Sequence, residues 1–331
     1  MQANSTKQYN IGFLGASNIA KKFAQDAQKL EDVKLYAVAS RSMEAAEAFK
    51  QQFNMVKSYD SYEKLADDED IDIIYVSTPN ALHKEHSLLC LSKRKAVICE
   101  KAFALSKEEA KEMVQMARKY QTFLMEAMWT RFLPSMQKAK EWVIENRIGH
   151  VKLLKGNFGV TSDNPNDIRF QRSLGGGALL DVGIYPISFA SYIFGIQPER
   201  IDASALFTPE GVDESLCMQL VYDEGQMAQF SVSINTYSPR DAYIIGENGY
   251  IHLPHAWYGK LAYLYSREGV LIDHFIDKTK EFGYHFELQE AISCLKEGRL
   301  ESSTMSLKES EAIMQTLDRI RNIIGLTFAS E

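Results

Sequence analysis

The fold is decided by the stretch Ile11-Gly12-Phe13-Leu14-Gly15-Ala16-Ser17-Asn18-Ile19-Ala20, which joins an apolar strand to the start of a helix. In dinucleotide-binding turns of this kind, one glycine makes the tight turn, a second lets the main chain approach the pyrophosphate, and a third allows close packing of helix on strand. Gly15 fills the first role, whereas Ser17 and Ala20 stand at the second and third. The Ser17 hydroxyl can donate to a phosphate oxygen, and a helix start offers N–H groups to an anion.

This turn predicts a dinucleotide site, and the alternative is a tight strand-to-helix connection that binds no phosphate. Its place in the first βα unit of an alternating pattern favours the dinucleotide. The contacts we expect from this segment are Gly12, Gly15, Ala16, Ser17, Asn18 and Ile19.

Between Tyr9 and about Ala127, short apolar runs alternate with amphipathic stretches. Nearly continuous apolar strands separated by helices are typical of a parallel sheet covered on both faces. We therefore predict an α/β chain whose residues 1–128 form a doubly wound Rossmann domain. The predicted strands are Asn10–Gly15, Lys34–Ser40, Ile71–Ser77, Ala96–Glu100 and Phe123–Ala127, and the predicted helices include Met43–Phe53, Leu82–Lys93 and Lys107–Tyr120.

After Arg131 the pattern changes, because longer strands with polar–apolar alternation replace the short buried ones. Hairpin turns are predicted at residues 247–249 and 267–269. We predict that residues 129–331 form an α+β domain around a large, mainly antiparallel sheet with one open face. Its predicted elements include helix Leu133–Asn146, strands Val151–Val160, Ser215–Tyr222 and Met227–Thr236, and helices His285–Lys296 and Leu307–Ile324.

Composition excludes several classes of protein. The 331 residues include 44 Asp and Glu against 37 Lys and Arg, a net charge of −7, which argues against nucleic-acid or anionic-membrane partners. We see no run of about 18 apolar residues, so we expect no membrane span. The polar N-terminus does not resemble a signal peptide, and the four cysteines lack disulfide or zinc spacing. We expect a soluble, cytoplasmic protein.

The end of the second predicted strand indicates the cofactor. Sites that prefer NAD usually place an acidic residue about 20 residues after the glycines, where it binds the ribose 2′-hydroxyl. This strand ends instead in Ser40-Arg41-Ser42, which supplies a guanidinium fork and hydroxyl donors suited to a 2′-phosphate. We predict NADP, with NAD possible, and the alternative is that Arg41 is a solvent-facing residue at a helix start.

Three further motifs follow predicted strands or stand far downstream. Ser77-Thr78-Pro79-Asn80, with His83 shortly after, ends one strand, and Cys99-Glu100-Lys101-Ala102 ends the next. Both belong to the carboxyl edge where doubly wound sheets bind ligands. The downstream motif is Gly175-Gly176-Gly177-Ala178-Leu179-Leu180-Asp181-Val182-Gly183-Ile184-Tyr185-Pro186.

Together these motifs resemble the glucose–fructose oxidoreductase/inositol dehydrogenase (Gfo/Idh/MocA) family over nearly the whole chain. The family's Glu-Lys-Pro motif is Glu100-Lys101-Ala102 here, so only its first two residues carry over. Many members have Asp-x-Gly-x-His where this chain ends in Tyr185. That tyrosine, with the stretch 126–132, looks most like the dimeric dihydrodiol dehydrogenase and aldose dehydrogenase branch.

The residue chemistry agrees with that resemblance. Reduction of a carbonyl needs a proton on oxygen, which the Tyr185 hydroxyl can supply. An unperturbed tyrosine pKa of ~10 makes a poor base for the reverse reaction, and a neighbouring cation such as Lys101 would lower it. Asp181 stands four residues before Tyr185, on the same face if this stretch begins a helix. Asp181 then orients Lys101 or binds a substrate hydroxyl.

The resemblance implies further contacts, and for each the alternative is plain packing, a helix cap or a solvated side chain. The cofactor contacts that it adds are Ser77, Thr78, Pro79, Asn80, His83, Glu100, Lys101, Trp129 and Arg131. The substrate contacts that it implies are Trp129, Phe158, Arg169 and Trp257. No metal site is expected, because neither His83-Lys84-Glu85-His86 nor His252-Leu253-Pro254-His255 has the order of a metal motif.

We therefore expect an NADP-dependent dehydrogenase or reductase acting on a sugar, polyol or cyclic diol, with Tyr185 and Lys101 handling the proton. The resemblance also implies a homodimer formed through the open sheet of the second domain. Two alternatives stay open: an NAD-dependent glycosidase of the same family, and a dinucleotide-sensing regulator without turnover. Lys101, Asp181 and Tyr185 argue against the regulator, because a sensor does not need them.

Overall fold

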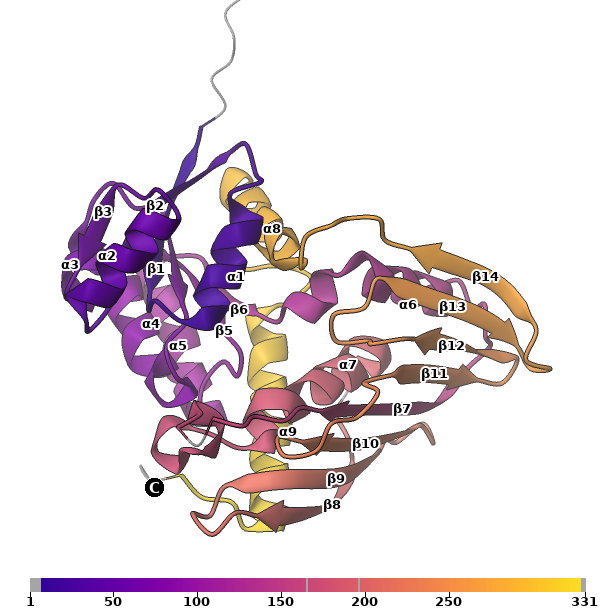
Figure 1. The fold of residues 1–331 in the computed structure, drawn as a ribbon. Helices are drawn as coiled ribbons and strands as arrows, with labels where there is room; N and C mark the ends of the chain where they lie inside the picture. Colours follow the sequence, from indigo (N-terminus) through magenta and orange to yellow (C-terminus); the bar gives the residue numbers. More distant parts are fainter. Residues whose placement is uncertain (1–6, 165, 196, 329–331) are drawn as a thin grey trace, which may run out of the picture. The chain divides into compact units, whose positions relative to one another are not determined.

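The computed structural model describes residues 7–164, 166–195 and 197–328, and the chain divides into two compact units (Figure 1). The first unit runs to Ala104 and also includes Glu108–Ala127 and Glu281–Leu307. The second consists of Leu105–Lys107, Met128–Lys280 and the chain from Lys308 onward.

The first unit contains a six-stranded parallel sheet of order β3-β2-β1-β4-β5-β6, which confirms the predicted Rossmann fold. The order reverses between β1 and β4, the point at which doubly wound sheets bind ligands. Every residue of β4, β5 and β6 is buried, because helices cover both faces of the sheet. The strands are β1 (Tyr9–Leu14), β2 (Val33–Ala39), β3 (Lys57–Tyr59), β4 (Ile73–Val76), β5 (Ala96–Glu100) and β6 (Leu124–Ala127).

Serine side chains start the first three helices of this unit. Ser17, Ser42 and Ser61 each accept a hydrogen bond from the main-chain N–H three residues further on, which caps the helix. The helices are α1 (Asn18–Ala27), α2 (Met43–Gln52), α3 (Tyr62–Asp67), α4 (His83–Ser92), α5 (Lys107–Tyr120) and α8 (Tyr284–Lys296), with a 3₁₀ turn, η1, at Asn80–Leu82.

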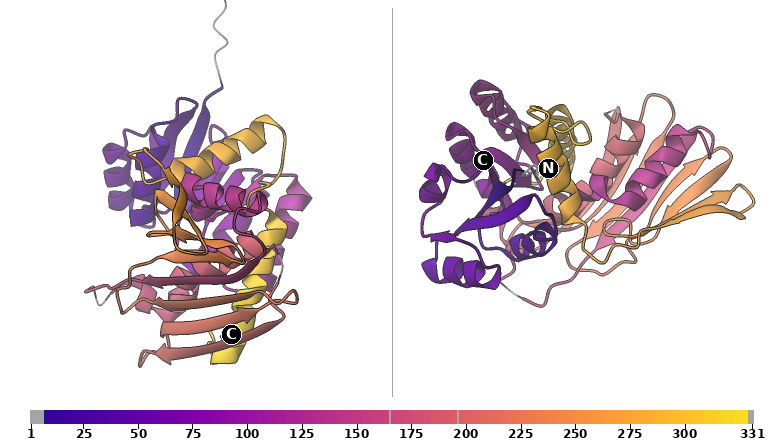
Figure 2. Two further views of the ribbon diagram at one scale, coloured as in Figure 1. Left: turned by 90° about the vertical axis from the view of Figure 1, so that its right-hand side faces the viewer. Right: turned by 90° about the horizontal axis from the view of Figure 1, so that it is seen from above.

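The second unit contains an eight-stranded sheet of order β14-β13-β12-β11-β7-β10-β9-β8. All neighbours are antiparallel except β7 and β10, so the predicted mainly antiparallel sheet is confirmed. Buried and exposed residues alternate along its strands, because helices cover one face only (Figure 2). The strands are β7 (Val151–Gly159), β8 (Arg200–Phe207), β9 (Asp213–Val221), β10 (Met227–Ser233), β11 (Ala242–Gly246), β12 (Gly249–Leu253), β13 (Leu261–Ser266) and β14 (Leu271–Ile276).

The helices of the second unit position its candidate site. A π-helical turn, η5, leads directly into α7, so the residues around Asp181 begin a helix, which the sequence pattern left open as a condition. The remaining short turns carry Trp129, Arg131 and Arg169. The elements are η2 (Trp129–Phe132), α6 (Pro134–Ile144), η3 (Ile168–Phe170), η4 (Arg172–Leu174), η5 (Leu179–Gly183), α7 (Ile184–Phe194) and α9 (Leu307–Ile324).

One segment differs from the predicted domain division. Residues 281–307, which include α8, group with the first unit, although the sequence pattern placed them in the second domain. The reason is a contact distant in sequence: Asp26 of α1 accepts hydrogen bonds from the N–H groups of Phe282, Gly283 and Tyr284 at the start of α8. A carboxylate at a helix start is favourable, since the helix dipole is positive there.

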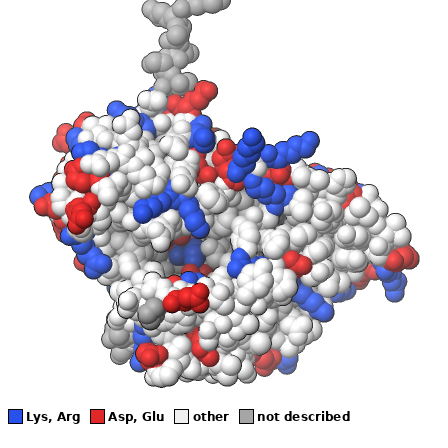
Figure 3. All heavy atoms as spheres, viewed as in Figure 1, with Lys and Arg blue, Asp and Glu red and all other residues white. Residues whose placement is uncertain are grey.

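Surface and hydropathy give two further observations. Basic and acidic side chains are interspersed on the face shown in Figure 3.

Residues 172–194 are long and apolar enough, by length and composition alone, to cross a membrane, and 83% of the relevant window is buried inside the protein. We predicted no such segment. This segment ends in the core helix α7. The burial of α7 within the second unit accounts for the apolar character of the segment.

Candidate active site

The predicted phosphate turn lies between β1 and α1. Gly15 has a φ of +107°, and a Cβ there would lie 3.1 Å from the Ser77 hydroxyl oxygen, so glycine allows the ends of β1 and β4 to approach. The Ser17 hydroxyl accepts from the Ala20 N–H at 3.1 Å and keeps its own proton to donate to an anion. Gly12 lies inside β1, where a Cβ would contact Ile71, so its position favours a packing role. Ala16, Asn18 and Ile19 complete the turn and begin the helix.

The segment expected to select the cofactor follows β2. Arg41 is exposed, and Ser42 caps α2 by accepting from the Ala45 N–H at 3.2 Å. Tyr62 and His86 lie beside Arg41. Burial raises the pKa of Tyr62 above its ordinary value, and the Arg41 charge offsets only part of that rise; burial lowers the pKa of His86, and the Arg41 charge adds to the decrease. Their rings are in edge-to-face contact at 4.7 Å.

Sequence reasoning missed Tyr62 and His86 as neighbours of Arg41, because they follow different strands and belong to no shared motif. The Ser40 hydroxyl accepts from the Ser42 N–H at 3.3 Å, which ties the loop to the helix start. The guanidinium that follows β2 therefore has an imidazole and a phenol beside it, and all three are groups that can donate hydrogen bonds.

His83 joins the two loops that carry the other cofactor motifs. Its Nδ1 lies 2.7 Å from the carbonyl oxygen of Ala102 and its Nε2 lies 2.7 Å from that of Thr78. Burial lowers the pKa of His83 to about 4, and the charge of Lys101 adds to that effect, although both carbonyls oppose it. His83 therefore connects the Thr78-Pro79-Asn80 loop to the segment after Lys101, whose peptide bond to Ala102 is cis.

Glu100, the residue before Lys101, belongs to a group of buried acidic side chains that also includes Tyr75 and Glu287. The Tyr75 hydroxyl donates to Glu100, and the Lys101 N–H donates to the other Glu100 oxygen at 3.2 Å. Burial raises the pKa of Tyr75 and of Glu287 well above their ordinary values, and the Glu100 charge adds to both shifts. Glu100 thus fixes the main chain at Lys101 from inside the first unit.

In the second unit, Tyr185 is the second residue of α7, and its side chain lies among other aromatic side chains. Its ring centroid is 5.2 Å from that of Phe158 and 6.4 Å from that of Trp257, and the Trp129 indole N–H donates to its hydroxyl at 3.2 Å. Tyr185 is 8% exposed, so the hydroxyl is largely shielded from water. The structure therefore brings Trp129, Phe158, Trp257 and Tyr185 together.

The other predicted residues of this unit divide into two groups. Asp181 precedes Tyr185 in η5, and its charge raises the pKa of Arg169, after the larger effect of the Asp167 ion pair at 2.6 Å. Arg131 instead donates to Ser188 at 2.9 Å and to Glu309 at 2.8 Å, and it is 3% exposed. Those bonds are typical of a residue that holds helices together, so they favour packing over the predicted cofactor contact.

Lys101 belongs to the first unit and Tyr185 to the second. Their meeting over one nicotinamide ring stays a prediction. Among residues 7–164, 166–195 and 197–328, no three His, Cys, Asp or Glu side chains gather as a metal ion would require.

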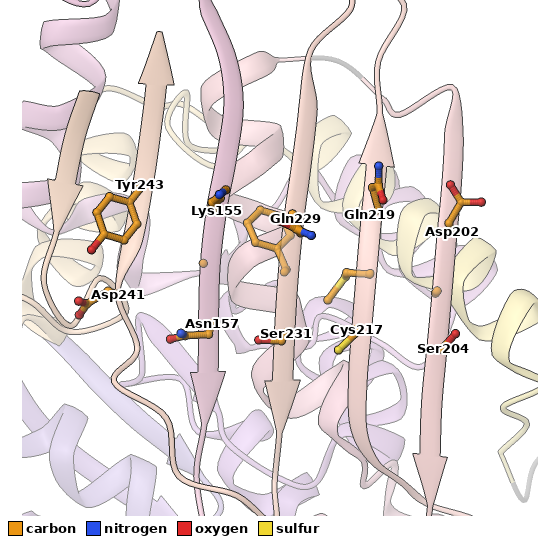
Figure 4. A pocket seen from close by; sticks show the side chains of 14 residues that line it. Lys155, Asn157, Asp202, Ser204, Cys217, Gln219, Gln229, Ser231, Asp241 and Tyr243 are labelled. Atoms are coloured by element: carbon orange, nitrogen blue, oxygen red, sulfur yellow. The ribbon is translucent and has the colours of Figure 1, made fainter. Parts of the chain in front are cut away.

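The open face of the second unit's sheet carries a shallow cavity of about 540 Å³ (Figure 4). Two polar rows cross the strands in register. One row contains Tyr243, Lys155, Gln229, Gln219 and Asp202, and the other contains Asp241, Asn157, Ser231, Cys217 and Ser204.

Two family models match the chain. "Oxidoreductase family, NAD-binding Rossmann fold" matches residues 9–128, and "GFO/IDH/MocA C-terminal domain" matches residues 136–252. Trans-1,2-dihydrobenzene-1,2-diol dehydrogenase of Mus musculus is 34% identical over 328 residues, which cover 97% of this chain and 98% of the mouse protein. The chain belongs to the Gfo/Idh/MocA oxidoreductase family. The predicted resemblance is confirmed.

Solved structures share the Gfo/Idh/MocA fold over almost the whole length. The 3-ketoreductase KijD10 from Actinomadura kijaniata, in complex with NADP and TDP-benzene, superposes with a TM-score of 0.87 at 21% identity, covering 96% of this chain and 98% of that one. The aldose-aldose oxidoreductase from Caulobacter crescentus, complexed with glycerol, has a TM-score of 0.86 at 22% identity, with 96% and 97% covered. As a Gfo/Idh/MocA protein, this chain is an oxidoreductase with an NAD(P)-binding Rossmann domain.

Proposed function

We propose that this chain is a cytoplasmic, NADP(H)-dependent oxidoreductase acting on a hydroxyl- or carbonyl-bearing carbon of a sugar, a polyol or a cyclic diol. The observation that carries the proposal is the setting of Tyr185: its hydroxyl accepts a hydrogen bond from the Trp129 indole N–H inside an aromatic pocket. The diol named for the mouse relative and the aldose named for the Caulobacter structure support the substrate class. Arg41, beside His86 and Tyr62, supports NADP over NAD.

The residues of the first unit fit a bound dinucleotide. The main chain at Gly15 carries no side chain, the start of α1 offers N–H groups, and Ser17 keeps a hydroxyl proton to donate. A nicotinamide dinucleotide held by these residues would supply the hydride for reduction of the substrate carbon.

The chain's own residues would then handle the proton. Tyr185 transfers its hydroxyl proton to the carbonyl oxygen and takes it back in the reverse direction. The Lys101 ammonium stabilises the negative charge on the phenol oxygen and on the substrate oxygen. Asp181 accepts a hydrogen bond from a second substrate hydroxyl or orients Lys101. Phe158, Trp129 and Trp257 exclude water from the reacting groups.

We also propose that two copies associate through the open sheet face of the second unit. Its polar rows hold both signs of charge, with Lys155 on β7, Asp202 on β8 and Asp241 just before β11. A two-fold axis through this face would pair each patch with its own copy, so a surface with both charges can complement itself.

The proposal is tested by following NADPH absorbance with aldoses, polyols and cyclic diols, and then by repeating the active reactions with Tyr185→Phe. We expect turnover to fall by about 10²–10⁴-fold, the range for losing an acid–base group, with NADPH affinity unchanged. Tyr192→Phe is the matched control, because it removes a hydroxyl from the same helix α7 and should leave turnover unchanged.

Two results would overturn the proposal. Full turnover in Tyr185→Phe would remove the tyrosine from the reaction. Sugar release without net consumption of NADPH would indicate a glycosidase that uses its dinucleotide transiently.

A further inference from the structure

Asp213, the first residue of β9, is a buried carboxyl group that faces main chain. It has no exposed surface, and its Oδ2 accepts from the Leu179 N–H at 2.7 Å. Within residues 7–164, 166–195 and 197–328, its Oδ1 has no hydrogen-bond partner. A fully buried carboxyl that is only half satisfied is costly, so its position calls for a physical reason.

The glycine run before η5 is shaped around this carboxyl. Gly177 has a φ of +125°, and a Cβ there would lie 2.0 Å from the Asp213 Oδ1. A Cβ on Gly176 would lie 2.5 Å from the carbonyl oxygen of Arg169. Side chains at these positions would push the loop away from Asp213, so the glycines let the carboxyl reach the helix start.

The helix that Asp213 reaches carries two residues assigned to the reaction. Leu179 begins η5, which contains Asp181 and continues into α7 with Tyr185 at its second residue. The first N–H groups of a helix lack partners within the helix, and an acceptor from another strand fixes them in place. The Asp181 N–H donates to the Gly177 carbonyl at 3.1 Å, so the loop, the carboxyl and the helix form one unit.

We propose that Asp213 is a positioning residue for Tyr185 and Asp181: its carboxyl sets where the helix starts, and thereby where the phenol lies against Trp129. This role rests on the proposed function, since Tyr185 and Asp181 are the residues assigned to the reaction. The effect of Asp213 on the position of the helix start can be measured without any turnover.

The charge state of Asp213 gives the proposal a signature. Burial raises the pKa of Asp213 to about 7, against the N–H groups of Leu179, Asp213 itself and Ala178. Arg169, Arg172 and Asp181 are the charged side chains on the neighbouring turns, and Glu214 follows on its own strand. A charged carboxylate accepts more strongly than a neutral acid, so the hold on Leu179 tightens as the pH rises through about 7.

The test uses two variants of the full chain. Asp213→Ala removes the acceptor, whereas Asp213→Asn keeps a carbonyl acceptor and removes the titration. Asp223→Ala, an exposed acid in the turn that follows β9, is the matched control. The first readout is the indole N–H resonance of Trp129 in ¹H–¹⁵N spectra without substrate, assigned with Trp129→Phe, with the Trp142 resonance as reference.

We expect the Trp129 resonance to move in Asp213→Ala, to titrate near pH 7 in the parent protein, and to stop titrating in Asp213→Asn. The second readout is turnover, which should fall roughly 10–100-fold in Asp213→Ala, the scale of a small misplacement, with NADPH affinity within about twofold of the parent. Asp213→Asn should recover most of that turnover.

An unmoved Trp129 resonance and unchanged turnover in Asp213→Ala would overturn the proposal. If Asp213→Ala does not fold, as circular dichroism would show, Asp213→Asn decides: a Trp129 titration identical to that of the parent overturns it. If no substrate is turned over by the parent, the proposed function fails, while the indole measurements still confirm or refute the positioning.

Discussion

Tyr185 combines a phenol hydroxyl with surroundings that keep water away from it. Trp129, Phe158 and Trp257 contact it, and each comes from a different part of the second unit. Such a pocket excludes water from the reacting oxygen while a substrate is bound. Under the proposed function, Tyr185 gives its proton to the substrate oxygen during reduction and regains one from solvent after the product has left.

Arg41 gives a residue-scale prediction about cofactor choice. Replacing it by alanine removes the guanidinium expected to bind the 2′-phosphate, so Arg41→Ala should weaken NADPH binding by about 10-fold or more and leave NADH binding nearly unchanged. Fluorescence titration with both cofactors measures this. Arg118→Ala, an exposed arginine on α5, is the control. Equal weakening of both cofactors would contradict the 2′-phosphate assignment.

Single residues were predictable where a motif states their role. Gly15 and Ser17 could be assigned from the turn alone, and the structure gives each a local reason. Arg131 could not, because its partner Glu309 is 178 positions away and no local pattern encodes that contact. Asp213 has no motif of its own, and only the glycine run opposite it offered a signal.

At the scale of elements, helix α8 is held by one carboxylate. Asp26 accepts from the N–H groups of Phe282, Gly283 and Tyr284, at distances of 2.7 to 3.2 Å. Burial raises the pKa of Asp26, but the His285 imidazole, 3.7 Å away, and the hydrogen bonds from these N–H groups outweigh it and keep the pKa below its ordinary value. The carboxylate therefore stays charged at neutral pH.

Asp26→Ala should lower the free energy of local opening of α8 by about 2–4 kcal/mol at pH 7, because several charge-assisted bonds to buried N–H groups are lost. Amide hydrogen exchange of α8 measures this. An acid with a lowered pKa stabilises the fold above its unfolded value of 3.8 and loses that effect as the pH falls through the folded value. The difference between parent and variant should therefore shrink below about pH 4.

Asp32→Ala provides the control, because Asp32 also bonds to α8, through Lys296 at 2.6 Å, but at the surface. Surface pairs of this kind contribute about 0–1 kcal/mol. Equal effects of the two substitutions would contradict the assigned role of Asp26.

Element prediction succeeded where burial or alternation was strong and failed where it was weak. Strand β5 and helices α5 and α9 have the predicted bounds. Strand β3 was missed because its three residues, Lys57–Tyr59, are partly exposed at the sheet edge and show no alternation. The grouping of α8 was missed because it depends on Asp26, more than 250 positions earlier.

At the scale of the whole molecule, the open sheet face gives a prediction about assembly. Cys217 lies exposed on β9 in one polar row of this face. Cys217→Arg would place two like charges across a two-fold interface, so the dimer expected for the parent protein should dissociate to a monomer. Sedimentation velocity measures both masses. Gln52→Arg, on α2 of the first unit, should leave the mass unchanged. A parent protein that sediments as a monomer would contradict the proposal.

The central claim is that a phenol from the second unit and an ammonium from the first act on one substrate oxygen. A crystal structure of the chain with NADP and an unreactive substrate analogue tests it most directly. We predict that the hydroxyl of Tyr185 and the Nζ of Lys101 both lie about 3 Å from the analogue's oxygen, beside the nicotinamide ring. A bound dinucleotide with either group turned away from that oxygen and far from it would contradict the account.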